Sequence, residues 1–505
     1  MHDRMASGTD ILYLHPSKPA ADFKDYARVG AASPYLLMPV GVPGMINLLR
    51  EHGFRVTGLN VPMEILINPQ FNLVTWLGRQ RGVSLVAIDL HWYEHAFGAL
   101  DVARVCKQVY PDVPVVIGGF TASCFATEIL SQFPQVDFII RGDAERPLLD
   151  LARRVCRQEG PALSEIPNLC FRSDGRVVEN EQSYCVTTED LNHLNCVDID
   201  FLVHAEQYYG LQFTTTERVE LISMTPLKGH WLTIGRGCRF RCSFCGGGRE
   251  SHATIAGRGG IVPRSVEQVV DDLARLQRMG IRQVSFNLDP AIMGDAYWSR
   301  LFAEMRRRKV RIGIYNECFQ LPSEDFLREF VETAEIVYSE LAISPLSGSE
   351  KVRQLNGKHF TNSQLLRVLS ILRPYEVPIF LYFSLNLPGE DEQTFRHTLQ
   401  LAKSVCQSYP PRCLRMINMC HTIDPCCPMS QDPHRYGIEV DFKTFIDYYR
   451  YCQETPVPRK DVDLGAWRGY KAVNRKPRSL ERMAQQWDAF CAGQRARCYP
   501  VPRMW

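Results

Sequence analysis

The chain has 505 residues, which is long enough for two or three domains. Its 58 basic and 56 acidic side chains balance, which argues against nucleic acid or an anionic membrane surface as a partner. The polar N-terminus lacks the apolar core of a signal peptide, and no apolar run reaches the roughly 18 residues that a membrane span needs. We therefore expect a cytoplasmic protein, in which metal binding accounts for some of the 18 cysteines better than disulfides do.

Residues 1–158 alternate short apolar runs with helical periods. Strands are predicted at Ile11–Leu14, Arg55–Asn60, Ser84–Ile88, Val113–Ile117 and Val136–Ile140, with a helix between each pair. This alternation predicts an α/β domain with a doubly wound, Rossmann-like parallel sheet, which binds ligands at the carboxyl ends of its strands. At those ends stand His15, Asp89, His91, Trp92, Gly118, Gly119, Thr121, Ser123, Gly142, Asp143 and Glu145.

Residues 159–228 form a connector with a predicted hairpin turn at Ser173–Arg176. Repeated strand and helix patterns over residues 229–430 predict a partial (β/α)6 barrel of about six strands, whose active site lies at the carboxyl ends of the strands. The predicted strands include Trp231–Ile234, Arg282–Leu288, Arg311–Tyr315, Ile336–Ile343 and Val377–Leu387. The polar residues that we place at strand ends are Asn287, Asp289, Glu317, Glu340, Ser344, Ser384 and Asn386.

Three cysteines, Cys238, Cys242 and Cys245, follow the first predicted barrel strand in one short loop. Three thiolates can hold a four-iron cluster and leave its fourth iron open for chemistry. A zinc site or free buried thiols are the alternatives. Zinc usually needs a fourth Cys or His at short spacing, and none follows in this loop.

This Cys-x3-Cys-x2-Cys loop, with Phe244 before its last cysteine, resembles that of the radical S-adenosylmethionine (SAM) superfamily. The resemblance implies a [4Fe-4S] cluster whose open iron binds SAM, and reductive cleavage of SAM to a 5′-deoxyadenosyl radical. It also makes the polar residues at the barrel strand ends candidates for contacts with SAM. Leu387–Glu390 and Asp424–Pro428 resemble turns of the B12-dependent branch of this superfamily.

The N-terminal domain resembles the cobalamin-binding domain that precedes the barrel in that branch. Gly118–Ser123 and Gly142–Glu145 resemble the turns that flank the nucleotide tail of the cofactor. The histidine-ligating motif of cobalamin methyltransferases is not matched, because Asp89-Leu-His91 follows the third strand and Glu94 replaces the glycine. We expect His91 or Trp92 to cover, or weakly ligate, the lower face of cobalt. A degenerate, empty domain of this type is the alternative.

Residues 431–505 are predicted to form a small helical region, with helices at Phe445–Tyr451 and Ser479–Cys491. Five cysteines lie close together in the sequence near the C-terminal end of the predicted barrel. They either hold a second cluster or present a thiol to the pocket, although their spacings are long for a shared ligand set. These residues are Cys406, Cys413, Cys420, Cys426 and Cys427.

The leading hypothesis is a cobalamin-dependent radical SAM methyltransferase, which transfers a methyl group from methylcobalamin to an unactivated carbon after hydrogen abstraction. Its expected cofactors are a [4Fe-4S] cluster, SAM and cobalamin. Its expected partners are a small-molecule substrate, which could be a natural-product or lipid precursor or a peptide, and a one-electron reductant such as flavodoxin or ferredoxin. The alternatives are a cobalamin-dependent cyclase or rearrangement enzyme, a radical SAM enzyme with a vestigial B12 domain, and a non-catalytic metal scaffold.

Overall fold

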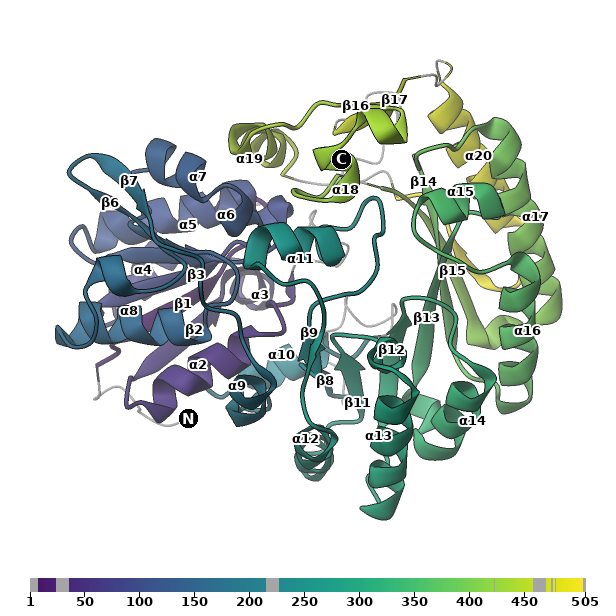
Figure 1. Cartoon of the computed structure of the whole chain (residues 1–505), viewed down its shortest axis with the longest axis horizontal. Coiled ribbons are helices and arrows are strands. Elements are labelled where there is room, and N and C mark those ends of the chain that lie inside the picture. The colour runs from purple at the N-terminus through teal and green to yellow at the C-terminus, as the bar shows by residue number, and fades with distance from the viewer. Residues whose placement is uncertain are drawn as a thin grey trace.

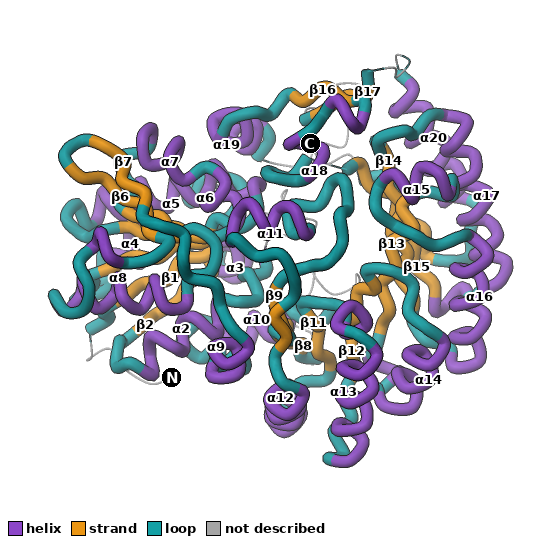
Figure 2. Tube along the Cα trace, viewed as in Figure 1, coloured by secondary structure: helices purple, strands orange, loops and turns teal. Residues whose placement is uncertain are grey.

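Two parallel α/β domains lie side by side in the computed structural model, and the C-terminal segment reaches across both (Figure 1). The structure describes residues 8–23, 36–214, 227–421, 423–456, 469–473, 476 and 478–502. Each domain contains one seven-stranded sheet with helices packed on it (Figure 2). Among the described residues, no helix is long and apolar enough to cross a membrane.

The first sheet has the strand order β2-β1-β3-β4-β5-β6-β7. Its first five strands are parallel, as predicted: β1 (Ile11–His15), β2 (Val56–Asn60), β3 (Leu85–Asp89), β4 (Val115–Gly118) and β5 (Phe138–Ile140). Alternate side chains of β1 point to opposite faces of the sheet and pack in two different hydrophobic cores. Ile11 and Tyr13 belong to one core, and Leu12 and Leu14 belong to the other, so both faces of the sheet are covered. The helices are α2 (Val42–Glu51), α3 (Val61–Ile67), α4 (Leu73–Leu77), α5 (Ala96–Val109), α6 (Phe120–Cys124), α7 (Ala126–Gln132) and α8 (Glu145–Arg157).

The connector adds its hairpin to this first sheet. Strands β6 (Leu169–Ser173) and β7 (Arg176–Glu179) are antiparallel to each other, which confirms the predicted turn, and β6 pairs antiparallel with β5. Two short helices, α9 (Thr188–His193) and α10 (Ala205–Leu211), then lead toward the second domain. The connector is therefore built onto the edge of the N-terminal domain.

The second sheet has the order β18-β15-β14-β13-β12-β11-β8, and every neighbouring pair is parallel. Because β8 and β18 are its two edges, it is an open, partial barrel, as predicted. The strands are β8 (Gly229–Leu232), β11 (Gln283–Phe286), β12 (Gly313–Cys318), β13 (Glu340–Leu346), β14 (Ile379–Leu385), β15 (Leu414–Cys420) and β18 (Arg497–Tyr499). The helices are α11 (Arg249–Ala256), α12 (Val266–Arg278), α13 (Asp295–Arg307), α14 (Glu324–Thr333), α15 (Glu350–Leu355), α16 (Asn362–Leu372) and α17 (Glu392–Ser408).

One strand of the barrel begins later in the chain than predicted, so one predicted site residue lies at the other end of its strand. Ile336–Tyr338 forms a 3-10 turn, and β13 begins at Glu340. The prediction that Glu340 stands at the carboxyl end of its strand is therefore wrong. Its side chain is buried at the opposite end of the barrel, where it forms an ion pair with Arg415 at the start of β15. This pairing compensates both charges in the barrel interior.

The C-terminal region contains the two predicted helices, α19 (Phe445–Glu454) and α20 (Ser479–Ala492), but the prediction of a purely helical region is incomplete. Strand β18 joins the barrel sheet beside β15, and β16 (Ile438–Val440) pairs with β17 (Tyr470–Ala472). Rings of α19 pack on the first domain, with Tyr449 at 5.2 Å from Phe97 between ring centroids. Trp487 of α20 packs on the barrel, at 5.4 Å from Phe383. The segment therefore holds the two domains together.

Candidate active site

A cavity of about 930 Å³ lies between the carboxyl ends of the strands of both sheets. The side chains and loops of both domains line it together, which places most of the predicted site residues around one space. From the first domain these are Asp89, His91, Trp92, Gly118, Gly119, Thr121, Gly142 and Asp143. From the barrel they are Cys238, Cys242, Phe244, Cys245, Asn287, Glu317, Ser344 and Ser384.

The three-cysteine loop lies between β9 (Gly235–Arg236) and α11. Backbone N–H groups donate to two of its sulfur atoms, from Phe240 to Cys238 Sγ and from Gly247 to Cys245 Sγ, both at 3.4 Å. Burial raises the pKa of all three thiols. Since thiolates are the ligating form, a bound metal centre must supply the charge that keeps them deprotonated.

The distances among the three sulfur atoms distinguish an iron–sulfur cluster site from a site for a single zinc ion. Among the described residues, only His15, Asp89 and His95 bring three Cys, His, Asp or Glu ligand atoms within 4.8 Å of one another, so the cysteine set is wider than that. Zn–S bonds of about 2.3 Å in a tetrahedron would put sulfur atoms roughly 3.8 Å apart. Three thiolates spaced more widely than this do not form a preformed tetrahedral zinc set, and their number is the one that a site-open [4Fe-4S] cluster uses.

The barrel wall beside the cysteines carries hydrogen-bonded polar groups. The Asn287 side chain accepts from Ile234 N–H at 2.8 Å and donates to the Gly235 carbonyl at 2.9 Å, which holds the start of the cysteine loop. Ser384 Oγ lies 2.9 Å from His421 Nε2, and the His421 ring stacks on Phe244 at 4.0 Å between centroids. These contacts fix polar groups next to the position of the cluster.

Several predicted residues lie behind the cavity wall. Ser123 Oγ accepts from Gly142 N–H at 3.0 Å and donates to the Gly119 carbonyl at 2.7 Å, so it joins the two glycine turns. The Asp289 carboxylate accepts the N–H groups of Ala291 and Phe319. The predicted residues that do not line the cavity are His15, Ser123, Glu145, Asp289, Glu340 and Asn386.

An ion-pair network crosses the domain boundary beside the cysteine loop. Arg236 lies 3.0 Å from Asp143 Oδ1 and 2.6 Å from Glu145 Oε1, and Arg258 also pairs with Asp143. Burial disfavours the Asp143 carboxylate, but the two guanidinium groups outweigh it and lower its pKa. Glu145, for which the sequence predicted cofactor binding, thus pairs with Arg236 across the domain boundary and does not line the cavity.

The sequence analysis missed other residues that line the cavity, among them Phe120, His252, Lys358 and His421. His91 stacks on Phe120 at 4.7 Å, and Phe120 meets the edge of His252 at 5.0 Å, so aromatic rings run from the first domain to α11. Phe120 lies within the Gly118–Ser123 turn that the sequence had singled out, whereas no spacing signal marked the other three, because each comes from a different helix or loop. Asp424, which accepts from Gly246 N–H at 2.9 Å, lay in a turn that the sequence had singled out.

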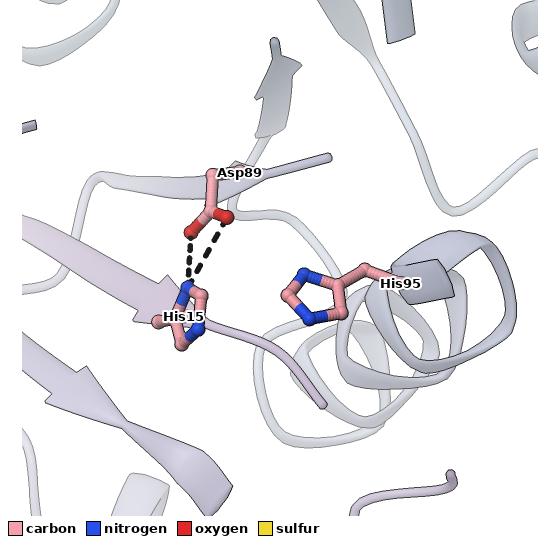
Figure 3. A group of neighbouring side chains, drawn as sticks. All are labelled: His15, Asp89 and His95. Atoms are coloured by element: carbon pink, nitrogen blue, oxygen red, sulfur yellow. Dashed lines mark hydrogen bonds and ion pairs between the residues drawn. The ribbon is translucent and has the colours of Figure 1, made fainter. Parts of the chain in front are cut away.

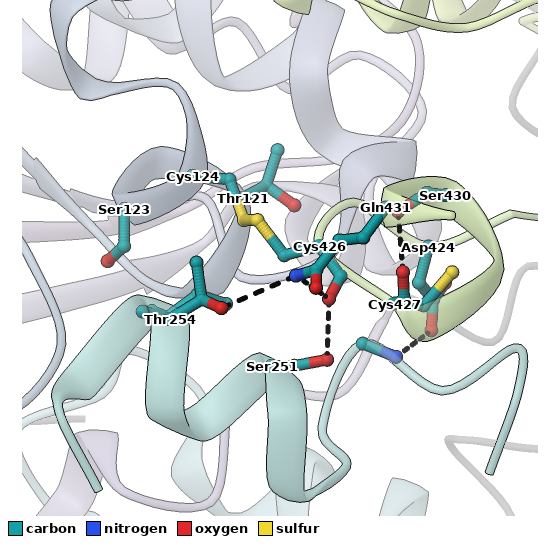
Figure 4. Close-up of a disulfide and its surroundings, with 12 residues drawn as sticks. Thr121, Ser123, Cys124, Ser251, Thr254, Asp424, Cys426, Cys427, Ser430 and Gln431 are labelled. Carbon is teal, nitrogen blue, oxygen red and sulfur yellow. Dashed lines mark hydrogen bonds between the residues drawn. A yellow bond between two sulfur atoms is a disulfide. The ribbon is translucent and has the colours of Figure 1, made fainter. Parts of the chain in front are cut away.

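The five C-terminal cysteines do not gather into a second metal site. Cys426 forms a disulfide with Cys124 of α6, which joins the first domain to the loop after β15 (Figure 4). Cys420 is buried in β15, and Cys406 contacts Cys498 of β18. Cys406, Cys420 and Cys426 therefore have different neighbours and do not share one cluster.

Family models match both domains. The Radical SAM superfamily matches residues 232–402, and the B12 binding domain matches residues 27–152. A tRNA-2-methylthio-N(6)-dimethylallyladenosine synthase of Acinetobacter baumannii (strain AYE) is 24% identical over 325 residues, covering 62% of this chain and 58% of that protein. An anaerobic magnesium-protoporphyrin IX monomethyl ester cyclase of Cereibacter sphaeroides is 22% identical over 315 residues, covering 60% and 47%. The chain thus spans less than two thirds of these relatives.

Two solved structures share the fold. The radical SAM methyltransferase TsrM of Kitasatospora setae, with cobalamin and a [4Fe-4S] cluster bound, superposes with a TM-score of 0.64 at 14% identity, over 88% of this chain and 81% of that chain. The cobalamin-dependent SAM radical enzyme OxsB superposes with a TM-score of 0.51 at 14% identity, over 79% and 52%. The arrangement of the two domains is therefore one that known proteins adopt.

Proposed function

Because the chain belongs to the radical SAM enzymes that carry an N-terminal B12-binding domain, we propose that it is a cobalamin-dependent methyltransferase acting on an unactivated carbon. When bound, the [4Fe-4S] cluster and SAM supply the radical initiator, and cobalamin supplies the methyl group. The observation that carries the proposal is one cavity lined both by the cluster cysteines and by the strand-end loops of the B12-binding domain.

Each cofactor would have its own part of the cavity wall. Cys238, Cys242 and Cys245 would hold the cluster. The groups that would orient SAM are Asn287, Glu317, Ser344 and Ser384, on neighbouring strand ends of the barrel. Those that would cradle cobalamin are Gly118, Gly119, Thr121 and Gly142, in two turns of the first domain.

The glycine turn of the first domain depends on a close backbone approach. Gly119 has a φ of +113°, and a Cβ there would lie 2.7 Å from backbone atoms of His91. Thr121 Oγ1 donates to the His91 carbonyl at 3.0 Å and holds the same two loops together. Only glycine at position 119 therefore lets the loops after β3 and β4 meet at the wall that would face the cofactor.

His91 is suited to face cobalamin. Its ring lines the cavity and makes no hydrogen bond with the described part of the chain. Burial lowers its pKa to about 4, so the imidazole is neutral at pH 7 and keeps a nitrogen lone pair. Trp92 meets the His91 ring edge-on at 4.9 Å between centroids and would cover the corrin beside it.

An aromatic cluster packs in the barrel interior next to the cavity. Tyr315, Phe380 and Tyr382 pack there with Trp231 and Tyr499, below the polar residues at the strand ends. This cluster would limit the entry of water from the barrel side, so a small-molecule substrate would enter between the domains. An external one-electron reductant, such as a flavodoxin or ferredoxin, would supply the electron.

The test uses SAM labelled with deuterium in its methyl group. The anaerobically purified protein, loaded with hydroxocobalamin and reconstituted with iron and sulfide, is incubated with labelled SAM and dithionite. A methyltransferase is expected to accumulate labelled methylcobalamin, identified by mass spectrometry. A protein that retains no corrin, or whose corrin never acquires the label, would refute the proposal.

A cyclase is the second candidate, because a curated relative is named as one. It would form 5′-deoxyadenosine from SAM without labelling the corrin. The same incubation therefore separates the two functions before the substrate is known.

A further inference from the structure

We propose that His15, Asp89 and His95 form a binding site for one divalent transition-metal ion, apart from the iron–sulfur cluster (Figure 3). One ligand atom from each of the three lies within 4.8 Å of the others. In the part of the chain that the structure describes, no other group of His, Cys, Asp or Glu meets this condition. The inference does not depend on the proposed methyl transfer.

The fold brings the three residues together from separate elements. His15 ends β1 and Asp89 ends β3, and these strands are parallel neighbours with Leu14 in register with Ile88. The chain then turns through the 3-10 helix Tyr93–His95, which places His95 at the start of α5. The parallel pairing of two strands and one tight turn therefore bring His15, Asp89 and His95 together.

The donor atoms are close and enclosed. His15 Nδ1 lies 3.0 Å from Asp89 Oδ1 and 3.2 Å from Oδ2, and the His15 and His95 rings meet edge-on at 5.2 Å between centroids. The exposed fractions of His15, Asp89 and His95 are 0%, 7% and 0%. A bound ion would be held away from bulk water, as in preorganised metal sites.

The types of ligand atom in this site indicate which metal ion it would bind. The group offers one carboxylate oxygen, from Asp89, and two imidazole nitrogens, from His15 and His95. The Tyr13 hydroxyl donates to Asp89 Oδ1 at 2.6 Å and would orient the carboxylate from behind. Two imidazoles and one carboxylate suit Zn²⁺ or Fe²⁺, and the absence of thiolates and the small number of oxygen donors disfavour Cu⁺, Mg²⁺ and Ca²⁺.

The site would act on the loop that faces the large cavity. Asp89 and His95 stand at the two ends of the segment that contains His91 and Trp92. An ion that binds both ends would fix this segment against β1. Its role would be to position the loop beneath the cobalamin cradle.

Zinc is the probe, because its content can be measured separately from the iron of the cluster. The full-length holoenzyme is incubated anaerobically with excess Zn²⁺ and dialysed, and zinc per chain is measured by plasma mass spectrometry. The wild type and a His193→Gln control, changed at an exposed histidine, are expected to retain about one zinc more than His95→Gln or Asp89→Asn. Equal zinc in all four proteins would overturn the proposal.

A second measurement does not depend on the folding of a variant. Zinc-edge X-ray absorption of the loaded wild type is expected to show nitrogen and oxygen neighbours alone, since the three ligands contain no sulfur. A spectrum dominated by sulfur neighbours would mean that zinc binds cysteines elsewhere, and would overturn the proposal. Circular dichroism confirms that each variant is folded before its zinc content is compared.

Discussion

Replacing Arg236 tests the ion pairs that join the two domains. Arg236→Met keeps most of the side-chain volume but removes the partner of Glu145, whose exposed side-chain fraction is 2%, and one of the partners of Asp143. Breaking a buried ion pair on one side leaves an uncompensated charge and costs about 3–5 kcal/mol. Because Asp143 keeps Arg258, we expect a cost near 3 kcal/mol.

The matched control is Arg50→Met. Arg50 and Asp200 are 34% and 66% exposed, and such surface pairs contribute at most about 1 kcal/mol. Urea unfolding, which leaves ion pairs unscreened, is followed by fluorescence and by cobalamin retention. With a slope near 3 kcal/mol per M, Arg236→Met is expected to lower the midpoint by about 1 M, and the control by a third of that or less.

A double variant tests the physical reason. Arg236→Met with Glu145→Gln should be more stable than Arg236→Met alone, because no unpaired carboxylate then remains at position 145. If Arg236→Met costs no more than Arg50→Met, the network does not hold the domains and the reasoning is refuted.

Three further predictions follow from individual residues. Cys242→Ala should reduce iron in the anaerobically reconstituted protein from about four per chain to near zero, whereas Cys420→Ala should leave it unchanged; equal iron in both would place the cluster elsewhere. In the air-exposed apoprotein, reduction should expose two further alkylatable thiols in the wild type and none in Cys124→Ser, as counted by mass spectrometry after unfolding; no gain in the wild type would contradict the disulfide. Burial raises the pKa of Asp289 to about 6, so the folded protein binds its proton more tightly than the unfolded chain, and stability should fall by up to about 3 kcal/mol as pH rises from about 4 to about 6. In Asp289→Asn, the free energy of unfolding, measured by urea titration at each pH, should not show this decrease. An unchanged decrease would exclude Asp289 as its source.

The sequence predicted those features that depend on neighbouring residues. The parallel strands appeared as apolar runs, and the ligand spacing of Cys238, Cys242 and Cys245 lies within one loop. The boundary of β13 was missed because Ile336-Val-Tyr338 continues the apolar pattern, and a 3-10 turn cannot be told from a strand over three residues.

Features that depend on distant parts of the chain were not predictable. Arg236 meets Asp143 and Glu145 only because the two domains dock, and no periodic pattern encodes that contact. His15 and Asp89 were placed at strand ends, but the approach of His95 depends on a tight turn that single-residue preferences do not specify. Glu340 was placed at the wrong end of its strand because the start of β13 was predicted too early. Its ion pair with Arg415 was also not predictable, because Arg415 lies 75 positions further along the chain.

The late position of β18 in the chain affects the order of folding during synthesis. The outer edge of β15 pairs with β18, and α19 and α20 are made between these two strands. Until β18 emerges from the ribosome, that edge has unpaired backbone groups and can template association with another nascent chain. The N-terminal domain folds earlier and offers α5 as a docking surface for α19, so it would hold the tail near the barrel while the last strand is delivered.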